Sequence, residues 1–290
     1  MNTPTADERH FSHDAMRATF TLRLRGVDAV TARGVACECF ELIDFIEARL
    51  SRFIEGGDVW RINRMRAGET LYLSEICHQC LLLALDAHAR TGGLFDITLG
   101  RSIEHRKSGG VGPPPPVTGG LIIHPDVPAL TCVESGRELD LGGIGKGFAL
   151  DQLKRILAGW GVEEALLGAG SSSLLALGSG EWPVDLCGDR RSLRVNLRAQ
   201  ALSASGTGIQ GGHIVHPAGE DAMPAAPCGR VWVTAASAAL AEIWSTALML
   251  VESSEIAEFI SGEEEIHGVH GHIGGVVREF HNPRRTSSAG

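Results

Sequence analysis

The segment Asp140-Leu-Gly-Gly-Ile-Gly-Lys-Gly147 brings a carboxylate, four glycines and a lysine together just before a stretch with helical spacing. Glycines let a ligand approach the backbone closely, and the first amides of a following helix favour an anion. The segment is not a P-loop, because neither Ser nor Thr follows Lys146, and it lacks the distant acid of a dinucleotide-binding fingerprint. Taken alone, it fits a phosphate site and a structural turn about equally well.

Two other segments combine carboxylates with hydroxyl groups. Asp96 and Thr98 could point the same way on a strand and share one polar partner, although a turn with a satisfied aspartate is the simpler interpretation. Glu242 and Thr246 lie on one face of an expected helix, with Ser245 beside them. A carboxylate with a hydroxyl suits Mg²⁺, which keeps few protein ligands. The alternative is a hydroxyl bonded back to its own helix.

Two histidines follow a glycine-rich stretch. His213-Ile-Val-His216-Pro217 comes after Ser205-Gly-Thr-Gly-Ile-Gln-Gly-Gly212, which we expect to be a loop. Histidine can accept a proton or contact a phosphate near neutral pH. Lone histidines are more often surface or capping residues, so this segment by itself does not define a site.

Cysteine and histidine pairs raise the alternative of a zinc protein. Cys77-His-Gln-Cys80 has CxxC spacing, and Cys37-Glu-Cys39 could supply two more thiolates. Both pairs fall inside expected amphipathic helices, where small buried cysteines are ordinary, so core packing is the simpler interpretation. A late trio of histidines could also hold a metal, although an exposed hairpin is the simpler account: His267, His270 and His272.

The bulk composition limits the classes of protein that could carry these residues. The chain has 290 residues, 43% hydrophobic and 21% charged, which indicates a globular protein with an ample core. A formal net charge of −9 argues against generic nucleic-acid binding, because neutralising phosphates needs a basic surface. No apolar run is long enough for a membrane span, and the first residues do not resemble a secretory signal, so we expect a cytoplasmic location.

The elements that must position these groups follow from periodicity. Residues 28–50 and 74–90 carry apolar groups at helical spacing, and Ser74 can cap the second helix. Residues 107–120 contain four consecutive prolines, which predict a loop. Further helices are expected near 147–159 and 236–249, and strands at 16–25, 129–133, 138–141, 165–178, 183–187, 192–196 and 230–234, before a terminal hairpin.

The order of these elements predicts the fold class. Long helices mixed with hairpins, without regular βαβ alternation, indicate an α+β fold. We expect a flexible leader over residues 1–13, a single domain over 14–282 and a flexible tail over 283–290.

Together the segments resemble, in order and approximate spacing, the FAD:protein FMN transferase (ApbE-like) family. Met16-Arg-Ala-Thr-Phe20 is similar to its opening strand, the stretch from Ser51 to Asn63 to its serine-to-asparagine segment, and Ala169-Gly-Ser-Ser-Ser173 to its second glycine turn. Several independent motifs in the right order make the resemblance specific. It implies a two-lobed architecture related to the T-fold, with mixed or antiparallel sheets, packed helices and the site in a cleft.

The resemblance also implies roles for individual residues, with FAD as the substrate and Mg²⁺ as the cofactor. The residues that would bind FAD are Met16, Phe53, Leu94, Phe95, Asp96, Asp140, Lys146, His213 and Ile214. Mg²⁺ would be held by Glu242, Ser245, Thr246 and the backbone carbonyl of Gly143. Lys146 would supply a second positive charge at the phosphates, and His213 would aid proton transfer.

The chain departs from the family pattern at several positions. Glu242 and His216 stand where the family usually has aspartate, and Phe53 stands where it often has tyrosine. Ala204 replaces a threonine, and Ser171 and Ser172 replace a glycine and an acidic or amide residue. The segment between the strand-like regions near residues 100 and 140 is also shorter and rich in proline.

The activity implied by the resemblance is magnesium-dependent transfer of FMN from FAD to a threonine or serine hydroxyl of an acceptor protein, with release of AMP. Two alternatives remain open at this point. A FAD pyrophosphatase would use water in place of the acceptor hydroxyl, and a flavin-binding relative would hold FAD and release no AMP.

Overall fold

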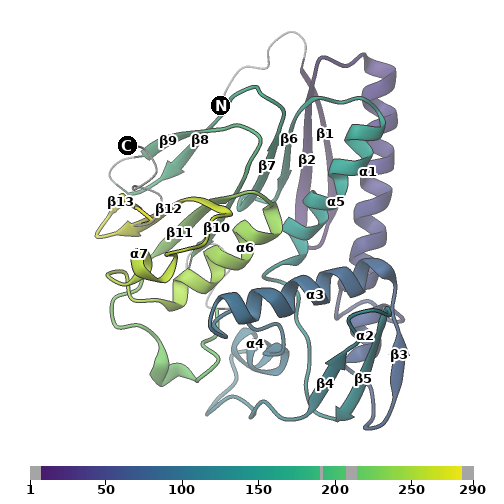
Figure 1. Ribbon diagram of the computed structural model, residues 1–290, viewed down its shortest axis with the longest axis vertical. Coiled ribbons are helices and arrows are strands. Elements are labelled where there is room, and N and C mark those ends of the chain that lie inside the picture. Colours follow the sequence, from purple (N-terminus) through teal and green to yellow (C-terminus); the bar gives the residue numbers. More distant parts are fainter. Residues whose placement is uncertain (1–7, 190–191, 207–213, 283–290) are drawn as a thin grey trace.

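The computed structural model describes residues 8–189, 192–206 and 214–282, which form two lobes (Figure 1). The larger lobe contains an eight-stranded sheet in the order β1-β2-β6-β7-β10-β11-β12-β13, in which neighbouring strands are antiparallel. Its strands are β1 (Glu8–Ala15), β2 (Ala18–Arg25), β6 (Glu164–Ala169), β7 (Ser173–Leu177), β10 (Ala201–Gly206), β11 (Arg230–Ala235), β12 (Ile266–Ile273) and β13 (Val276–Phe280).

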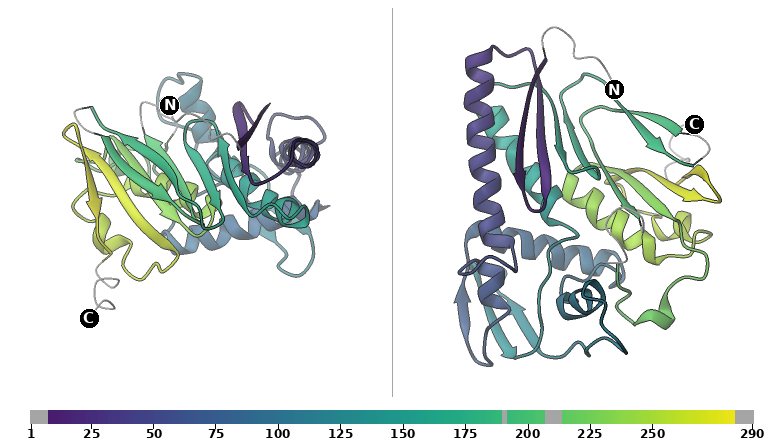
Figure 2. Two further views of the ribbon diagram at one scale, coloured as in Figure 1. Left: turned by 90° about the horizontal axis from the view of Figure 1, so that it is seen from above. Right: turned by 180° about the vertical axis from the view of Figure 1, so that it is seen from behind.

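Helices cover one face of this sheet (Figures 1 and 2). They are α1 (Ala29–Leu50), α5 (Gly145–Gly159) and α6 (Ala238–Ala247), with the one-turn η2 (Leu248–Leu250) and the short α7 (Ile256–Phe259) after them. Asp28 caps α1, because its side chain accepts hydrogen bonds from the amides of Val30 and Thr31 at 2.8 and 3.1 Å. The apolar stripe expected for this helix is buried at Val35, Cys39, Ile43 and Ile46.

A separate hairpin covers part of the other face. Strands β8 (Trp182–Cys187) and β9 (Ser192–Leu197) pair with each other and enclose a second apolar cluster. Trp182, one of its two tryptophans, is 1% exposed, and the guanidinium of Arg25 lies 3.5 Å from its ring centroid. The large sheet therefore has apolar groups on both faces, which explains the continuous apolar runs of β6 and β7.

The smaller lobe contains a three-stranded sheet and three helices. The sheet order is β3-β5-β4, from β3 (Thr70–Tyr72), β5 (Ala129–Glu134) and β4 (Gly120–Ile123), and the helices are α2 (Asp58–Ile62), α3 (Glu75–Arg90) and α4 (Gly100–Lys107). Ser74 caps α3 at the amide of Cys77, as predicted, and Asp58 in turn accepts hydrogen bonds from Ser74. α3 lies along the junction of the two lobes (Figure 1).

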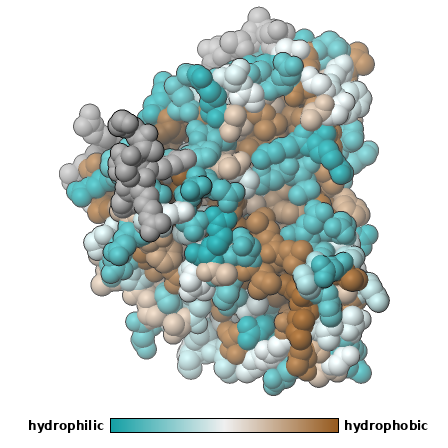
Figure 3. All heavy atoms as spheres, viewed as in Figure 1, coloured by the Kyte–Doolittle hydropathy of each residue, from teal (hydrophilic) through white to brown (hydrophobic). Residues whose placement is uncertain are grey.

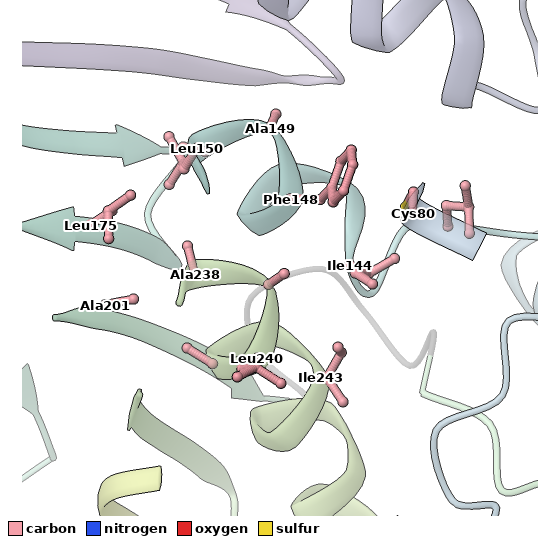
Figure 4. Packing of buried hydrophobic residues seen from close by; sticks show 14 of the residues in the cluster. Cys80, Ile144, Phe148, Ala149, Leu150, Leu175, Ala201, Ala238, Leu240 and Ile243 are labelled. Carbon is pink, nitrogen blue, oxygen red and sulfur yellow. The ribbon is translucent and has the colours of Figure 1, made fainter. Parts of the chain in front are cut away.

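The main core continues through that junction. Figure 4 shows side chains from α3, α5, α6 and the large sheet gathered in one cluster, among them Cys80, Phe148 and Ile243. α5 and α6 approach closely at Gly147, where an added Cβ would lie 2.3 Å from the carbonyl oxygen of Ala238. The glycine is therefore required by packing, and it fixes the start of α5 against the start of α6.

The α+β fold predicted from the sequence is confirmed, as are several of its parts. The helices predicted at 28–50, 74–90 and 147–159 and the loop at 107–120 form within one or two residues of the expected bounds. The terminal hairpin expected over residues 270–280 also forms, but its first strand begins at Ile266. Glycine at 145 and not residue 147 begins α5, so the glycine-rich segment lies partly inside the helix.

Other expectations were wrong. Residues 8–13 belong to β1 and are not part of a flexible leader, because each of them pairs with a residue of β2 in the antiparallel ladder. Residues 138–141 form no strand, and 165–178 are two strands joined by a turn at 170–172. Ser205 and Gly206 end strand β10, whereas the rest of that expected loop, residues 207–212, lies outside the described residues, as does the tail at 283–290.

The surface mixes polar and apolar residues. On the face in Figure 3, hydrophilic and hydrophobic side chains are interspersed. Within the described residues, no helix combines the length and the apolar character that crossing a bilayer requires.

His270 gives the fold a predictable pH dependence. It lies on β12, between β11 and β13, and its side chain is buried. Desolvation lowers the pKa of its imidazole, with an opposing effect of Glu279 and a further lowering from His281. The unfolded chain therefore takes up a proton more readily than the folded chain, and stability is lost as the pH falls below about 6.5. We expect urea unfolding to show a smaller loss of unfolding free energy between pH 7.5 and 5.5 in His270→Phe than in the wild type. Equal losses would contradict a neutral buried imidazole.

Candidate active site

Two adjoining hollows lie between the lobes and share Lys107, Asp140, Gly142 and Lys146. The first hollow is defined by Leu94, Phe95, Asp96, Gly143, Ser205, Ile214, Glu242 and Thr246 together with the shared residues. The second hollow is defined by Met16, Arg17, Glu47, Arg52, Phe53 and Gly145 together with the same shared residues, and has a volume of about 670 Å³. That volume lies in the range of small-molecule sites. The segment 140–146 is thus the common wall of a continuous cleft.

Lys146 and Glu242 form the charged centre of the first hollow. The ammonium of Lys146 lies 3.1 Å from Oε1 of Glu242, which also accepts a hydrogen bond from the Ser173 hydroxyl. Oε2 of Glu242 accepts a bond from the amide of Gly147 at 2.8 Å. The carboxylate is 3% exposed, so these three donors supply what water would otherwise provide. The arrangement holds a cation at the edge of the hollow.

Hydroxyl groups line the neighbouring wall. Ser205 Oγ lies 2.9 Å from Ser245 Oγ and 3.3 Å from Thr246 Oγ1. Thr246 faces the hollow near Gly143, as the helical spacing with Glu242 predicts. Ser245 is fully buried and is not among the lining residues, and its hydroxyl donates to the carbonyl of Glu242. The structure therefore brings Glu242, Thr246 and Gly143 together, but it places Ser245 behind them.

Asp140 is held in place by Arg52. The guanidinium bonds to Glu138 at 2.6 Å and to the carbonyl of Gly100 at 2.8 Å, and it lies 3.5 Å from Asp140. Asp140 Oδ1 also accepts from the amide of Gly142 at 2.8 Å, which fixes the glycine turn. Asp140 therefore orders the wall shared by both hollows.

The segment after α3 contributes one side of the first hollow. Leu94, Phe95 and Asp96 all line it. Asp96 Oδ1 accepts bonds from the amide and the hydroxyl of Thr98, each at 2.7 Å, so the two residues form a turn and not a strand, in agreement with the simpler interpretation. Arg137 donates to the Thr98 hydroxyl at 3.0 Å and ties this turn to the smaller lobe.

Met16 and Phe53 both line the second hollow. Phe53 is 57% exposed, so its ring is available to a planar ligand. The backbone amide of Met16 donates to Oε1 of Glu47 at 2.8 Å, which connects the β1–β2 turn to α1. Both residues line this hollow, and their role in binding FAD stays a prediction.

The histidine segment is only partly described. His213 lies outside the described residues. Ile214 lines the first hollow, and its carbonyl accepts a bond from Arg106 at 3.1 Å. His216 does not line that hollow. Its Nδ1 accepts from the amide of Ala218 in a local turn, and burial lowers the pKa of its imidazole.

Three of the four cysteines in the possible zinc pairs are core residues, whereas Cys37 is exposed. Cys39, Cys77 and Cys80 are buried in α1 and α3, and burial raises the pKa of the Cys39 thiol to about 12 and that of Cys77 and Cys80 further still. Because zinc binds the thiolate, such thiols are poor ligands. Within the described residues, no group of three His, Cys, Asp or Glu side chains is placed to hold a metal ion. The late histidines lie on β12. An exposed hairpin was expected there, but the side chain of His270 is buried.

Several residues of the cleft were missed by sequence reasoning. Arg52, Lys107, Ser173 and Ser205 all touch it or hold its members. Arg52, Ser173 and Ser205 lie in segments singled out from the sequence, but their roles depend on partners from distant segments, which spacing does not reveal. Asn63 could have been found from the sequence, because it ends the serine-to-asparagine segment of the family resemblance. Its amide group exchanges two bonds with the backbone of Leu139 at 2.7 and 2.9 Å.

The fold and the cleft define a class of two-lobed α+β proteins whose site lies where a glycine-rich turn enters a helix. Within that class the chain belongs to the ApbE family, because the model of the ApbE family matches residues 16–269. The match covers most of both lobes and includes the residues of both hollows.

Solved structures support the same fold. The flavin transferase ApbE from Vibrio cholerae is similar with a TM-score of 0.80 at 18% identity, over 98% of this chain and 99% of that one. The flavinyl transferase ApbE of Pseudomonas stutzeri, in its apo form, gives 0.80 at 20% identity over 96% of both chains. The ApbE protein of Thermotoga maritima gives 0.79 at 20% identity, over 94% and 96%. A comparison with curated proteins found no match.

Proposed function

We propose that the protein transfers FMN from FAD to a threonine or serine hydroxyl of an acceptor protein and releases AMP. The observation that carries this proposal is the cation of Lys146, held 3.1 Å from buried Glu242 at the junction of two hollows. A dinucleotide needs room for two rings on either side of a pyrophosphate, and the charge of Lys146 stands at that midpoint. Family membership and the fold of the flavin transferases agree with it.

The residues present fit Mg²⁺. A carboxylate offers about four lone-pair sites, and the Glu242 carboxylate accepts three bonds from protein donors, so one site remains for a metal. Thr246 and the carbonyl of Gly143 would complete a set of hard oxygen donors in the same hollow. When bound, the ion would neutralise charge that develops on the pyrophosphate.

The chain's own residues account for the remaining parts of the reaction. The acceptor hydroxyl oxygen bonds to the FMN phosphorus while the bond between that phosphorus and the bridging oxygen breaks, and AMP leaves with the electron pair. Lys146 binds the phosphate oxygens and is kept in place by Glu242, whose carboxylate accepts a hydrogen bond from Ser173. We assign His213 as the acceptor of the hydroxyl proton, a role that stays a prediction because His213 lies outside the described residues.

The remaining assignments also stay predictions. Met16 and Phe53 would hold a ring in the second hollow, and Leu94, Phe95 and Asp96 would contact FAD in the first. Asp140 would act through the glycine turn that it fixes. A cytoplasmic location and the absence of nucleic-acid partners remain expectations from the sequence.

The function is tested by following AMP release from FAD, with and without Mg²⁺ and with a candidate acceptor protein. We expect metal-dependent AMP release together with the mass of FMN on the acceptor. AMP and free FMN without acceptor would instead identify a pyrophosphatase, and FAD binding without cleavage would identify a flavin-binding protein. A chain that binds no FAD under any of these conditions would contradict the proposal.

A further inference from the structure

The turn between β1 and β2 has an unfavourable backbone conformation for its residues. Ala15 pairs with Ala18, so Met16 and Arg17 form a two-residue hairpin loop. Both have positive φ, 50° and 56°. Loops of this kind favour Asn-Gly, because side chains with a Cβ are strained in the left-handed region. Two large side chains thus occupy a turn where glycine would be easier to accommodate.

This conformation presents Arg17 to the second hollow. The Arg17 guanidinium lies 5.2 Å from the centroid of the Phe53 ring, and both side chains line the hollow. The hydrogen bond from the backbone amide of Met16 to the carboxylate of Glu47 holds the turn in position. The Arg17 guanidinium therefore lies over the Phe53 ring, and the Arg52 guanidinium lies 5.6 Å from the same centroid, so the hollow offers an aromatic side chain flanked by two cations.

Arg17 differs from the other cations of the hollow because no carboxylate of the described residues pairs with it. Arg52 is paired with Glu138, and Lys146 is paired with Glu242. Lys107 lies 4.0 Å from Asp140. Arg17 forms no ion pair within the part of the chain that the structure describes. A guanidinium without a carboxylate partner in a hollow is suited to an anionic ligand.

We propose that Arg17 is a specificity-determining residue, which binds the phosphate of a nucleotide whose ring stacks on Phe53. The inference rests on the proposed function, and the nucleotide is the AMP half or the FMN half of FAD. A guanidinium binds a phosphate through two parallel hydrogen bonds, and an aromatic side chain binds a planar ring. The strain of the turn is the cost of placing that guanidinium.

The test compares Arg17→Gly and Arg17→Lys with the wild-type protein. Ala199→Gly is the matched control, because Ala199 also has a positive φ, 45°, and belongs to neither hollow. Calorimetry would measure the affinities for AMP and adenosine and for FMN and riboflavin, and thermal unfolding would measure Tm without ligand. The two pairs identify which half of FAD occupies the site.

In Arg17→Gly we expect the affinity for one phosphorylated ligand to fall by about tenfold, with little change for its unphosphorylated partner. Tm should rise by about 1–3 °C, because glycine relieves the strain. Arg17→Lys keeps the charge but not the planar fork, so its loss should be smaller. Ala199→Gly should raise Tm and leave all four affinities unchanged.

An Arg17→Gly variant that still discriminates phosphorylated from unphosphorylated ligands as the wild type does would overturn the inference. If that variant also transferred FMN normally, the proposed function would be supported and only the role of Arg17 would be contradicted. If the wild type bound none of FAD, AMP and FMN, both the proposed function and the role of Arg17 would be contradicted.

Discussion

Replacing Lys146 by methionine is expected to lower the rate of FMN transfer by about two to three orders of magnitude. Removal of one preorganised donor to a developing anion has an effect of this size. Lys146 is preorganised, because Glu242 holds its ammonium at 3.1 Å within the first hollow. The measurement is AMP release under saturating FAD, which separates the loss of rate from a loss of binding.

The same substitution should also destabilise the fold, and a double variant separates the two effects. Lys146→Met leaves the carboxylate of Glu242 buried without its counter-ion, which we expect to cost about 3 kcal/mol of unfolding free energy. Lys146→Met combined with Glu242→Gln removes both charges, so stability should be largely restored while transfer stays low. Lys154→Met, in an exposed part of the same helix, is the control. Normal transfer in the double variant would show that Lys146 has no part in the chemistry.

The sequence predicts those parts of the fold that depend on local signals. Asp28 and Ser74 are capping residues in front of apolar stripes, and both helices begin where these residues place them. The prolines of residues 107–120 likewise exclude regular structure through their own geometry. Each of these signals lies within a few residues of the structure that it determines.

Strands were harder to predict because their stability comes from their neighbours. β1 is polar at every position except Phe11 and Ala15, which favours a polar leader, but β2 pairs along its whole length. The last two residues of β10, Ser205 and Gly206, were expected in a loop because both have low strand propensity. β10 lies between β7 and β11 in the interior of the large sheet, and tertiary contacts outweigh that propensity.

In the candidate site, too, local spacing predicted some features, and contacts between distant segments determined the others. The helical spacing of Glu242 and Thr246 correctly placed both in one hollow, because two residues four apart share a helix face. The spacing could not show that Ser245 points away from the hollow into the core. Nor could it reveal the bond between Gly147 and Glu242, which are 95 residues apart and meet only because α5 packs on α6.

That packing leads to a second large effect, the replacement of Gly147 by alanine. The new Cβ would lie 2.3 Å from the carbonyl oxygen of Ala238 and 2.8 Å from the amide nitrogen of Ala239. Backbone atoms cannot turn away as a side chain can, so α5 and α6 must separate. We expect a loss of about 3 kcal/mol of unfolding free energy, measured by urea denaturation, from overpacking and from a weakened bond between the Gly147 amide and Glu242.

Gly145→Ala is the matched control for this prediction. Gly145 begins the same helix, and an added Cβ there would meet nothing within 4 Å. Alanine favours the helix over glycine, so this variant should be as stable as the wild type or more stable by up to about 1 kcal/mol. Equal stability of the two variants would contradict the close approach of α5 and α6. A specific loss in Gly147→Ala should be accompanied by reduced FMN transfer, because the contact that fixes the start of α5 also orients the carboxylate that holds Lys146.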